Sequence, residues 1–215
     1  MSLTLHYHPL SSYCQKVLVA LYENDTPFER LQVDLQDPES RARFAELWPL
    51  AKFPVLRDDE KGKTIPESTI IIEYLDAFYP GKNKLIPTAP AESVACRMLD
   101  RIIDLHVHDQ MQKIVGDKLR PQGRRDPEGV LRARATLETA YRFLESELGD
   151  RTWALGDSFS LADCAACPAL FFAGHVEPFS DAFPRLRAYF ARLSERPSFA
   201  RATAEAAPFM KFFPG

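Results

Sequence analysis

Two adjacent serines, Ser11 and Ser12, stand where an alternating, strand-like segment gives way to a helical one near Cys14. The first turn of a helix presents unpaired N–H groups and the positive end of the helix dipole, so an anion binds favourably above it. Redox proteins of this strand-to-helix type carry Cys-x-x-Cys at this place, whereas this chain reads Ser-x-x-Cys. A hydroxyl cannot form a disulfide with a substrate, but it can donate a hydrogen bond to a bound thiolate.

A hydrogen bond from a serine, together with the helix N-terminus, is strong enough to lower the pKa of a bound thiol toward neutral pH. A thiol of pKa about 8.5 is only about 3% ionised at pH 7, and lowering its pKa by about 2 units requires roughly 2.7 kcal/mol. One charge-assisted hydrogen bond contributes roughly 1.5 to 3 kcal/mol and a helix N-terminus roughly 0.3 to 1 kcal/mol more. We therefore predict that Ser11 stabilises a bound thiolate, with Ser12 as the alternative donor. Either serine would also serve as an ordinary N-cap.

The cysteines offer a rival chemistry. Cys14 lies in the first helical turn, where a thiol can have a lowered pKa and form a mixed disulfide with a small thiol. Its spacing from Ser11 favours instead a small core residue that faces the sheet. Cys164 and Cys167 are spaced like a redox pair, but they lie inside a wholly apolar helical segment, so we expect them to pack in a core.

Two further motifs suit a peptide ligand. Pro54 in Lys52-Phe-Pro-Val55 stands at the entrance to a strand and must lie at an edge or turn. A cis bond there would leave the N–H and C=O of Val55 free to pair with an extended peptide, although trans is the commoner state. Lys52 would approach the carboxylate of that peptide. Ser68 and the start of its helix would hold a second carboxylate, and Glu67 would accept from an ammonium group.

These motifs occupy the first 80 residues, for which the pattern predicts a small α/β domain of order βαβαββα. We expect strands at 3–7, 28–33, 53–57 and 64–65, and helices at 14–22, within 34–46, and at 68–78. A proline-rich linker, 81–90, then leads to an all-helical domain, 91–215.

The helical domain is expected to contain helices at 91–115 and 127–148, and a central helix after the capping box Ser160-Leu-Ala-Asp163. Pro168 should bend that central helix, and Pro184 and Pro197 should each begin a further helix.

The composition narrows the classes of function. Hydrophobic residues make up 46% of the 215 positions, which indicates a globular protein with a real core. Acidic and basic residues are interspersed with a net charge of −3, so we expect no nucleic-acid or membrane partner. Four scattered cysteines, no signal peptide and no apolar run of roughly 18 residues predict a cytoplasmic protein. His106 and His108 point to nearly opposite sides of a helix, so no metal site is predicted.

The chain resembles the cytosolic glutathione S-transferases over nearly its whole length. The resemblance rests on five features that occur in this order: Ser-x-x-Cys-x-Lys-Val, Lys-Phe-Pro-Val, Pro-Glu-Ser, a proline-rich linker and Ser-Leu-Ala-Asp. The serine pair is similar to the serine-type classes, including the zeta class with its maleylacetoacetate isomerase activity. Tyr13-Cys-Gln-Lys16 departs from that class, which has Ser-Cys-Ser followed by Arg.

The resemblance implies a thioredoxin-like domain that binds glutathione, with Ser11 as the catalytic hydroxyl. A cis Pro54 followed by Val55 would hold the cysteinyl moiety, and Glu67 and Ser68 would hold the γ-glutamyl end. An electrophile pocket would be walled by the first helix of the second domain, and the family is usually dimeric. The candidate residues of that pocket are Tyr13, His106, Gln110 and Met111. His106 would equally suit an interdomain contact.

We therefore expect a homodimeric transferase of alkyl or aryl groups, with glutathione as co-substrate, no metal and a role in detoxification. It would lower the pKa of the glutathione thiol and add the thiolate to a double bond or displace a leaving group. Two alternatives remain at this point. One is a non-catalytic binding or regulatory protein of the same fold, and the other is a thiol transferase that depends on Cys14.

Overall fold

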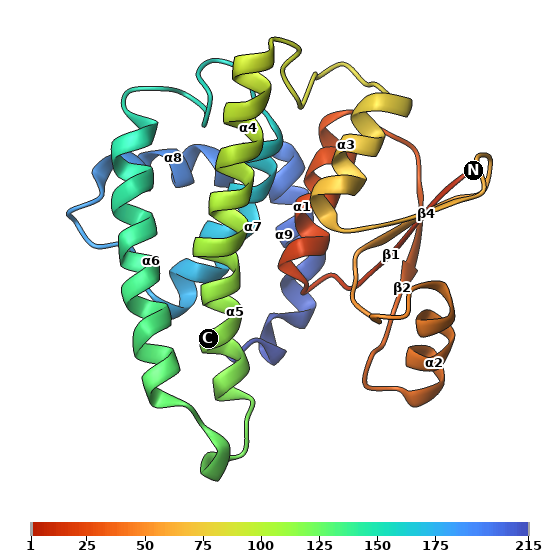
Figure 1. Ribbon diagram of the computed structural model, residues 1–215, viewed down its shortest axis with the longest axis horizontal. Helices are drawn as coiled ribbons and strands as arrows, with labels where there is room; N and C mark the ends of the chain where they lie inside the picture. Colours follow the sequence, from red (N-terminus) through yellow and green to blue (C-terminus); the bar gives the residue numbers. More distant parts are fainter. Residues whose placement is uncertain (1, 215) are drawn as a thin grey trace.

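A mixed four-stranded sheet flanked by three helices makes up the first part of the computed structural model, which describes residues 2–214 (Figure 1). Its elements are β1 (Leu3–Tyr7), α1 (Ser12–Glu23), β2 (Glu29–Gln32), α2 (Pro38–Leu47), β3 (Val55–Asp58), β4 (Lys63–Pro66) and α3 (Ser68–Phe78). The strand order is β2-β1-β3-β4, with β1 and β2 parallel and the other neighbours antiparallel. This arrangement confirms the predicted βαβαββα order.

Apolar patterning positions β1 and α1. Leu3, Leu5 and Tyr7 are buried and alternate with half-buried residues, as a strand with one covered face requires. Leu5 lies opposite Leu56 of β3 in the antiparallel register. Helix α1 is buried on almost every side, because it contacts α3 of its own half as well as α7 and α9 of the helical half. The start of α1 is therefore held rigidly at the boundary between the two halves.

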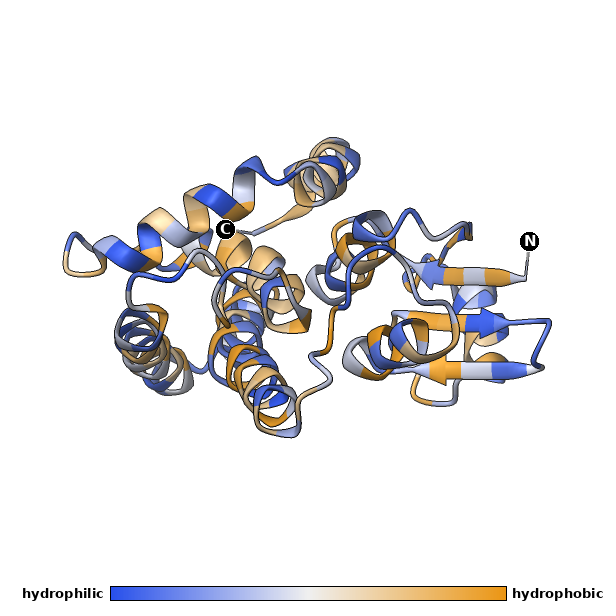
Figure 2. Cartoon of the chain, turned by 90° about the horizontal axis from the view of Figure 1, so that it is seen from above, coloured by the Kyte–Doolittle hydropathy of each residue, from blue (hydrophilic) through white to orange (hydrophobic). Residues whose placement is uncertain are grey.

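The second part of the described chain is helical and contains no strand after β4. Its elements are α4 (Pro90–Ile102), a π-helix (Ile103–His108), α5 (Asp109–Lys118), a 3-10 turn (Gln122–Arg124), α6 (Pro127–Leu148), α7 (Leu161–Val176), α8 (Pro184–Glu195), α9 (Pro197–Ala206) and a 3-10 segment (Ala207–Phe212). Figure 2 shows the helical half and the sheet side by side, with apolar positions recurring in the strands and central helices. The predicted all-helical second half is confirmed.

Local signals at helix starts act as expected. Pro184 and Pro197 each occupy the first position of a helix, where a missing N–H costs nothing. The capping box before α7 is formed, since Asp163 Oδ2 accepts the N–H of Ser160 at 2.9 Å. Pro168 lies within α7. Pro184, Pro197 and the capping box set where their helices begin.

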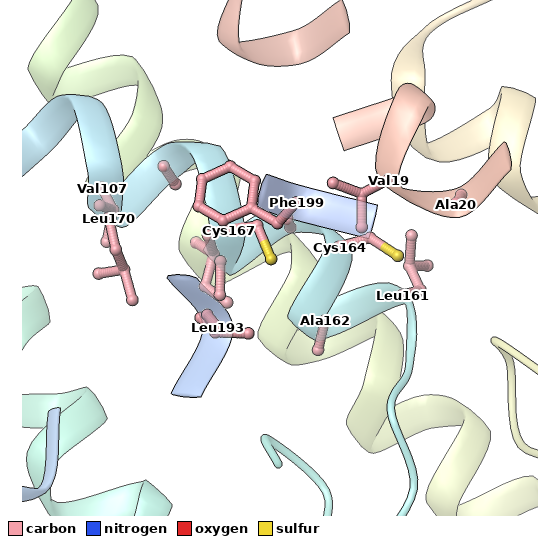
Figure 3. Close-up of a cluster of buried hydrophobic side chains, with 14 of the residues drawn as sticks. Val19, Ala20, Val107, Leu161, Ala162, Cys164, Cys167, Leu170, Leu193 and Phe199 are labelled. Atoms are coloured by element: carbon pink, nitrogen blue, oxygen red, sulfur yellow. The ribbon is translucent and has the colours of Figure 1, made fainter. Parts of the chain in front are cut away.

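Helix α7 is the enclosed helix of the second half, as its uniformly apolar sequence predicted. Cys164 and Cys167 are fully buried free thiols, which confirms that they pack in the core. Figure 3 shows both cysteines among apolar side chains that include Val19, Leu193 and Phe199. Burial raises the pKa of both thiols well above the ordinary range, so neither is a thiolate at neutral pH.

Two further observations concern the described residues as a group. Across residues 2–214 no helix is both long enough and apolar enough to cross a membrane. Within the same range, no group of three or more His, Cys, Asp or Glu side chains is placed to hold a metal ion.

Candidate active site

Two cavities adjoin where the sheet half meets the helical half, and Phe53 lines both of them. We call the larger, of about 520 Å³, the charged cavity; it is lined by Tyr13, Lys52, Phe53, Pro54, Glu67, Ser68, Thr69, Ile70, Glu73, Arg97, Asp100, Arg101, Asp104, Leu105 and Asp109. We call the smaller, of about 330 Å³, the apolar cavity; it is lined by His8, Leu10, Ser11, Ser12, Phe53, Met111, Gln112, Val115, Leu119, Phe172, Phe212, Phe213 and Pro214. Among the described residues, no Asp, Glu, Lys or Arg lines the apolar cavity.

Ser11 is the N-cap of α1 and lines the apolar cavity. Its Oγ accepts a hydrogen bond from the backbone N–H of Cys14 at 3.3 Å. That bond uses an oxygen lone pair, so capping does not consume the hydroxyl proton. The ordinary role of an N-cap and the donation of a hydrogen bond to a ligand are thus compatible in one side chain.

Ser12 also lines the apolar cavity, but its surroundings differ. Its side chain is only 2% exposed, and its Oγ accepts a hydrogen bond from Nε2 of Gln112 at 3.2 Å. The Ser12 hydroxyl is therefore tied to α5 of the helical half, whereas the Ser11 hydroxyl is tied only to its own helix.

Cys14 is fully buried, as the sequence predicted for a core residue. Burial raises the pKa of its thiol to about 12, against the opposing effect of a hydrogen bond with Ser11. At neutral pH the side chain is a protonated thiol without access to solvent. This environment is the opposite of the one that activates a catalytic cysteine.

The peptide bond between Phe53 and Pro54 is cis. Lys52, Phe53 and Pro54 line the charged cavity, but Val55 lines neither cavity. Val55 is fully buried and is paired in the sheet on both sides, with β1 and with β4. Phe53 is the residue of this motif that reasoning from the sequence missed, although its position next to Pro54 was a signal.

Glu67 and Ser68 form the N-terminus of α3 and both line the charged cavity. Glu67 has a φ of +69°, a left-handed backbone conformation that costs of order 1–3 kcal/mol in a residue other than glycine. No side chain caps this helix, so its first N–H groups remain open to a ligand. The helix end can therefore receive a carboxylate beside the Glu67 carboxylate, which suits an ammonium group.

The π-helix, Ile103–His108, changes which residues of this long helical stretch face inward. In a π-turn the backbone hydrogen bond reaches five residues along instead of four, so the inward stripe shifts by one residue. His106 is exposed and lines neither cavity, whereas His108 is fully buried. The prediction that His106 lines the electrophile pocket is wrong for this reason.

The other predicted pocket residues are divided among three places. Met111 lines the apolar cavity. Gln110 lines neither cavity; it is buried, and its Nε2 donates to the carbonyl of Leu105 at 2.8 Å. Tyr13 lines the charged cavity, and its ring stacks on that of His108 with centroids 3.8 Å apart. Burial raises the pKa of Tyr13, so its hydroxyl stays protonated.

A buried ionic cluster, which we define as Lys16, Thr69, Asp100 and Asp104, borders the charged cavity. Nζ of Lys16 lies 2.6 Å from Oδ1 of Asp100 and 2.8 Å from Oδ2 of Asp104, and the lysine side chain is fully buried. It also donates to Oγ1 of Thr69 at 2.9 Å, and Thr69 donates to Asp100 at 2.8 Å. Burial raises the pKa of Asp100, against the effect of the Lys16 charge. The cluster thereby joins α1 and α3 to the helical half.

Comparison with known proteins places both halves in one family. Residues 5–83 match the family described as "Glutathione S-transferase, N-terminal domain", and residues 103–197 match "Glutathione S-transferase, C-terminal domain". A probable maleylacetoacetate isomerase of Vibrio cholerae is 30% identical over 97% of this chain and 98% of its own length. FtsZ-localized protein A of Caulobacter vibrioides is 30% identical over 91% of this chain and 88% of its own. A crystal structure of a glutathione S-transferase from Methylobacillus flagellatus with GSH bound is 30% identical, with a TM-score of 0.86 over 94% of this chain and 98% of that one.

Proposed function

This chain belongs to the glutathione S-transferase family, and we propose that it binds glutathione in the charged cavity and activates the sulfur as a thiolate at Ser11. The observation that carries this proposal is that Ser11 lines the apolar cavity, which shares Phe53 with the charged cavity. Charged groups of both signs suit a zwitterionic tripeptide, and apolar walls suit a hydrophobic electrophile. A sulfur at the junction would lie near the positive end of α1 and within reach of the Ser11 hydroxyl.

The charged cavity offers a partner for each polar end of glutathione. Lys52 would attract the glycyl carboxylate, and Glu67 would accept from the γ-glutamyl ammonium group. The γ-glutamyl carboxylate would meet Ser68 and the open N–H groups of α3. For the cysteinyl main chain we propose Phe53 in place of the predicted Val55, because Phe53 lines both cavities, whereas Val55 is buried and paired in the sheet on both sides.

The reaction would transfer the glutathione sulfur to an electrophilic carbon. The Ser11 hydrogen bond and the α1 terminus stabilise the thiolate relative to the thiol, so a larger fraction of bound glutathione is nucleophilic at neutral pH. The thiolate then adds to a double bond or displaces a leaving group from an alkyl or aryl substrate. The four buried free cysteines suit a reducing compartment, and we place the protein in the cytoplasm. Detoxification of such electrophiles is the role that this activity would serve.

A second candidate function is binding without turnover. The name of one relative, FtsZ-localized protein A, describes a location and not a transferase. A protein with that kind of role could keep the glutathione site and lack catalysis. The third alternative, a Cys14-dependent thiol transferase, is disfavoured by the burial and raised pKa of that thiol.

The test measures binding, ionisation and turnover of glutathione separately. Calorimetry is expected to show glutathione binding, and ultraviolet difference titration is expected to show its thiol pKa lowered by about 2 units when bound. Conjugation of chlorodinitrobenzene should follow with saturation kinetics. Binding with an unshifted thiol pKa and no conjugation would support the non-catalytic candidate. Absence of both glutathione binding and conjugation would refute the proposed function.

We further propose that the chain forms a homodimer through apolar side chains of α3, α4 and the π-helix. Ile70, Val94, Met98 and Leu105 are 51%, 67%, 47% and 45% exposed, an unusual number of large apolar groups on neighbouring elements. Ile70 and Leu105 also line the charged cavity, so a second copy on this face would help to close the glutathione site. Sedimentation should give a dimer for the wild type and a monomer for Val94→Glu with Met98→Glu. A monomeric wild type would refute this part alone.

A further inference from the structure

His8 lines the apolar cavity together with Ser11 and is not used by the function proposed above. Two phenylalanines hold its ring. Phe53 stacks on it with centroids 6.1 Å apart and an interplanar angle of 20°, and Phe209 meets it edge-on at 5.3 Å. The imidazole therefore has a fixed orientation in the cavity wall.

A backbone hydrogen bond fixes the tautomer of His8. The N–H of Leu10 donates to Nδ1 of His8 at 3.2 Å, so Nδ1 must carry the lone pair. The neutral ring then carries its proton on Nε2. Burial lowers the pKa of His8, against the opposing charge of Asp34, so the ring is neutral at pH 7. At neutral pH His8 is thus an N–H donor in the wall of the same cavity as Ser11.

The other residues of the apolar cavity limit which substrates can accept a hydrogen bond from His8. Besides His8, its polar side chains are Ser11, Ser12 and Gln112, and Gln112 already donates to Ser12. No Asp, Glu, Lys or Arg among the described residues lines it, so a charged substrate would lose hydration without gaining an ionic partner. A substrate that suits this cavity is neutral and largely apolar, with one hydrogen-bond acceptor for His8.

We propose that His8 is a further catalytic residue and that the apolar cavity takes neutral α,β-unsaturated carbonyl compounds, with Nε2–H of His8 donating to the carbonyl oxygen. This inference rests on the proposed activation of glutathione at Ser11. It excludes dicarboxylate substrates from this cavity, because they would bring two uncompensated charges into an apolar site.

The chemical step follows from that geometry. A lone pair of the glutathione thiolate forms the carbon–sulfur bond at the β-carbon, and the electrons of the carbon–carbon double bond move to give an enolate. The negative charge gathers on the carbonyl oxygen, where the His8 N–H stabilises it more strongly than it does the neutral carbonyl. Water then protonates the α-carbon, the hydroxide left behind combines with the proton that the thiol released, and the saturated thioether leaves. No oxidant or reductant is needed.

Two substitutions separate the donor from the structural role of His8. His8→Asn keeps an acceptor for the N–H of Leu10, because an asparagine side chain readily bonds the N–H two residues on, but it lacks the distal donor. His8→Gln offers an amide N–H near the former Nε2 position. His6→Asn is the matched control, since His6 lies on β1, two residues before His8, and lines neither cavity.

Substrates with and without a carbonyl group test this inference separately from the proposed function. Benzylideneacetone is a neutral enone, benzyl chloride has no carbonyl, and benzoylacrylate differs from its ethyl ester by a carboxylate charge. For benzylideneacetone, His8→Asn should lower kcat/KM at least tenfold, since one oxyanion donor typically contributes about 100- to 1,000-fold. Benzyl chloride conjugation should change less than threefold, His8→Gln should recover part of the loss, and His6→Asn should match the wild type. The wild type should accelerate conjugation of the ester at least tenfold more than that of the acid.

Several results would overturn the inference. One is an unchanged kcat/KM of His8→Asn for benzylideneacetone, and another is equal acceleration of ester and acid. If His8→Asn loses activity toward both substrates, the activity of His8→Gln distinguishes the donor role from a structural role. A His8→Gln variant that does not recover enone conjugation refutes the donor role. A wild type that conjugates benzyl chloride but not benzylideneacetone refutes this inference and leaves the proposed function standing. A wild type that conjugates nothing refutes both.

Discussion

Ser11 and Ser12 are chemically identical neighbours that differ in what already surrounds their hydroxyl groups. The Ser11 oxygen accepts a backbone N–H of its own helix, while Ser12 is nearly inaccessible and bonded to Gln112 of the other half. A ligand sulfur that approaches along the apolar cavity would meet Ser11, whose hydroxyl contacts only Cys14 of its own helix, without breaking a bond to the helical half. The assignment of the thiolate donor to Ser11 depends on this difference.

We predict that Ser11→Ala lowers kcat/KM for chlorodinitrobenzene at least tenfold, equivalent to about 1.4 kcal/mol of transition-state stabilisation. Its pH profile should shift upward, because the bound thiol loses the donor that lowers its pKa. Ser12→Ala should change kcat/KM less than threefold.

Loss of the N-cap by itself is expected to reduce stability by about 1 kcal/mol in Ser11→Ala. Asp37→Ala provides the matched control, since Asp37 caps the exposed helix α2 through Ser40 and lines neither cavity. It should lower the melting temperature comparably without affecting conjugation. A larger catalytic loss in Ser12→Ala than in Ser11→Ala would contradict the assignment.

At the scale of single residues, the sequence predicted those site residues that belong to a short local motif. Lys52, Glu67 and Ser68 reach the charged cavity because each stands at a turn or helix end that its own neighbours specify. Lys16 and His8 were not predicted as site residues. Their environments depend on segments that are distant in the chain, such as Asp100 around Lys16 and Phe209 beside His8.

Helix α3 begins with a residue in an unfavourable backbone conformation, and this points to a functional constraint at its N-terminus. We predict that Glu67→Gln raises the KM for glutathione at least tenfold, because a charge-assisted bond to the ammonium group contributes roughly 1.5 to 3 kcal/mol. The kcat and the melting temperature should change little, since glutamine has the same shape.

Glu60→Gln is the control for that prediction, because Glu60 is exposed in the turn between β3 and β4 and lines neither cavity. It should leave the KM for glutathione at the wild-type value. If Glu67→Gln lowered the melting temperature markedly and left KM unchanged, the role of Glu67 would be structural.

Most elements were predictable because their signals are local, and the π-helix was not. Helices α3 and α6 begin and end at the predicted residues, set by proline, a cap and apolar periodicity. The stretch at 103–108 has the same residue types as an α-helix, and the extra residue in its turn is a property of packing between neighbouring helices. That single residue leaves His106 exposed, against the prediction, and buries His108.

The ionic cluster around Lys16 acts on the scale of the whole molecule, because its members come from both halves. We predict that Lys16→Met lowers the free energy of unfolding by about 3–5 kcal/mol, since it leaves buried carboxylates without their cation. Urea unfolding at neutral pH measures this change.

Lys82→Met is the control for the cluster, because it removes an exposed pair with Asp25 at 2.7 Å. It should change the free energy of unfolding by about 1 kcal/mol or less. Adding Asp100→Asn and Asp104→Asn to Lys16→Met should recover part of the loss. A Lys16→Met protein as stable as the wild type would show that the cluster does not hold the halves together.

Stability should also depend on pH through His108, which packs between Tyr13 and the ionic cluster. Burial lowers the pKa of His108, against the effect of Asp104, whose Oδ1 lies 3.8 Å from Nδ1. The unfolded chain, with an ordinary pKa of about 6.5, therefore binds more protons than the folded one. The contribution of His108 is complete above about pH 6.5 and is lost as pH falls toward the folded pKa.

We accordingly predict that the free energy of unfolding decreases between about pH 7 and pH 5. His108→Phe should make that decrease smaller, because phenylalanine keeps the stacking on Tyr13 and cannot be protonated. His106→Gln, at the exposed position, should leave the pH dependence as it is in the wild type. An identical slope in His108→Phe would exclude His108 as its source.

The ion pairs of Lys16 also bear on how the two halves of such proteins can be exchanged. A chimera that joins the first half of this chain to the helical half of a relative inherits the Lys16 ammonium group, but not necessarily Asp100 and Asp104. Without those carboxylates the fused protein would enclose an uncompensated positive charge at its seam. Recombination within the family should therefore succeed when the lysine and its two acidic partners are transferred together.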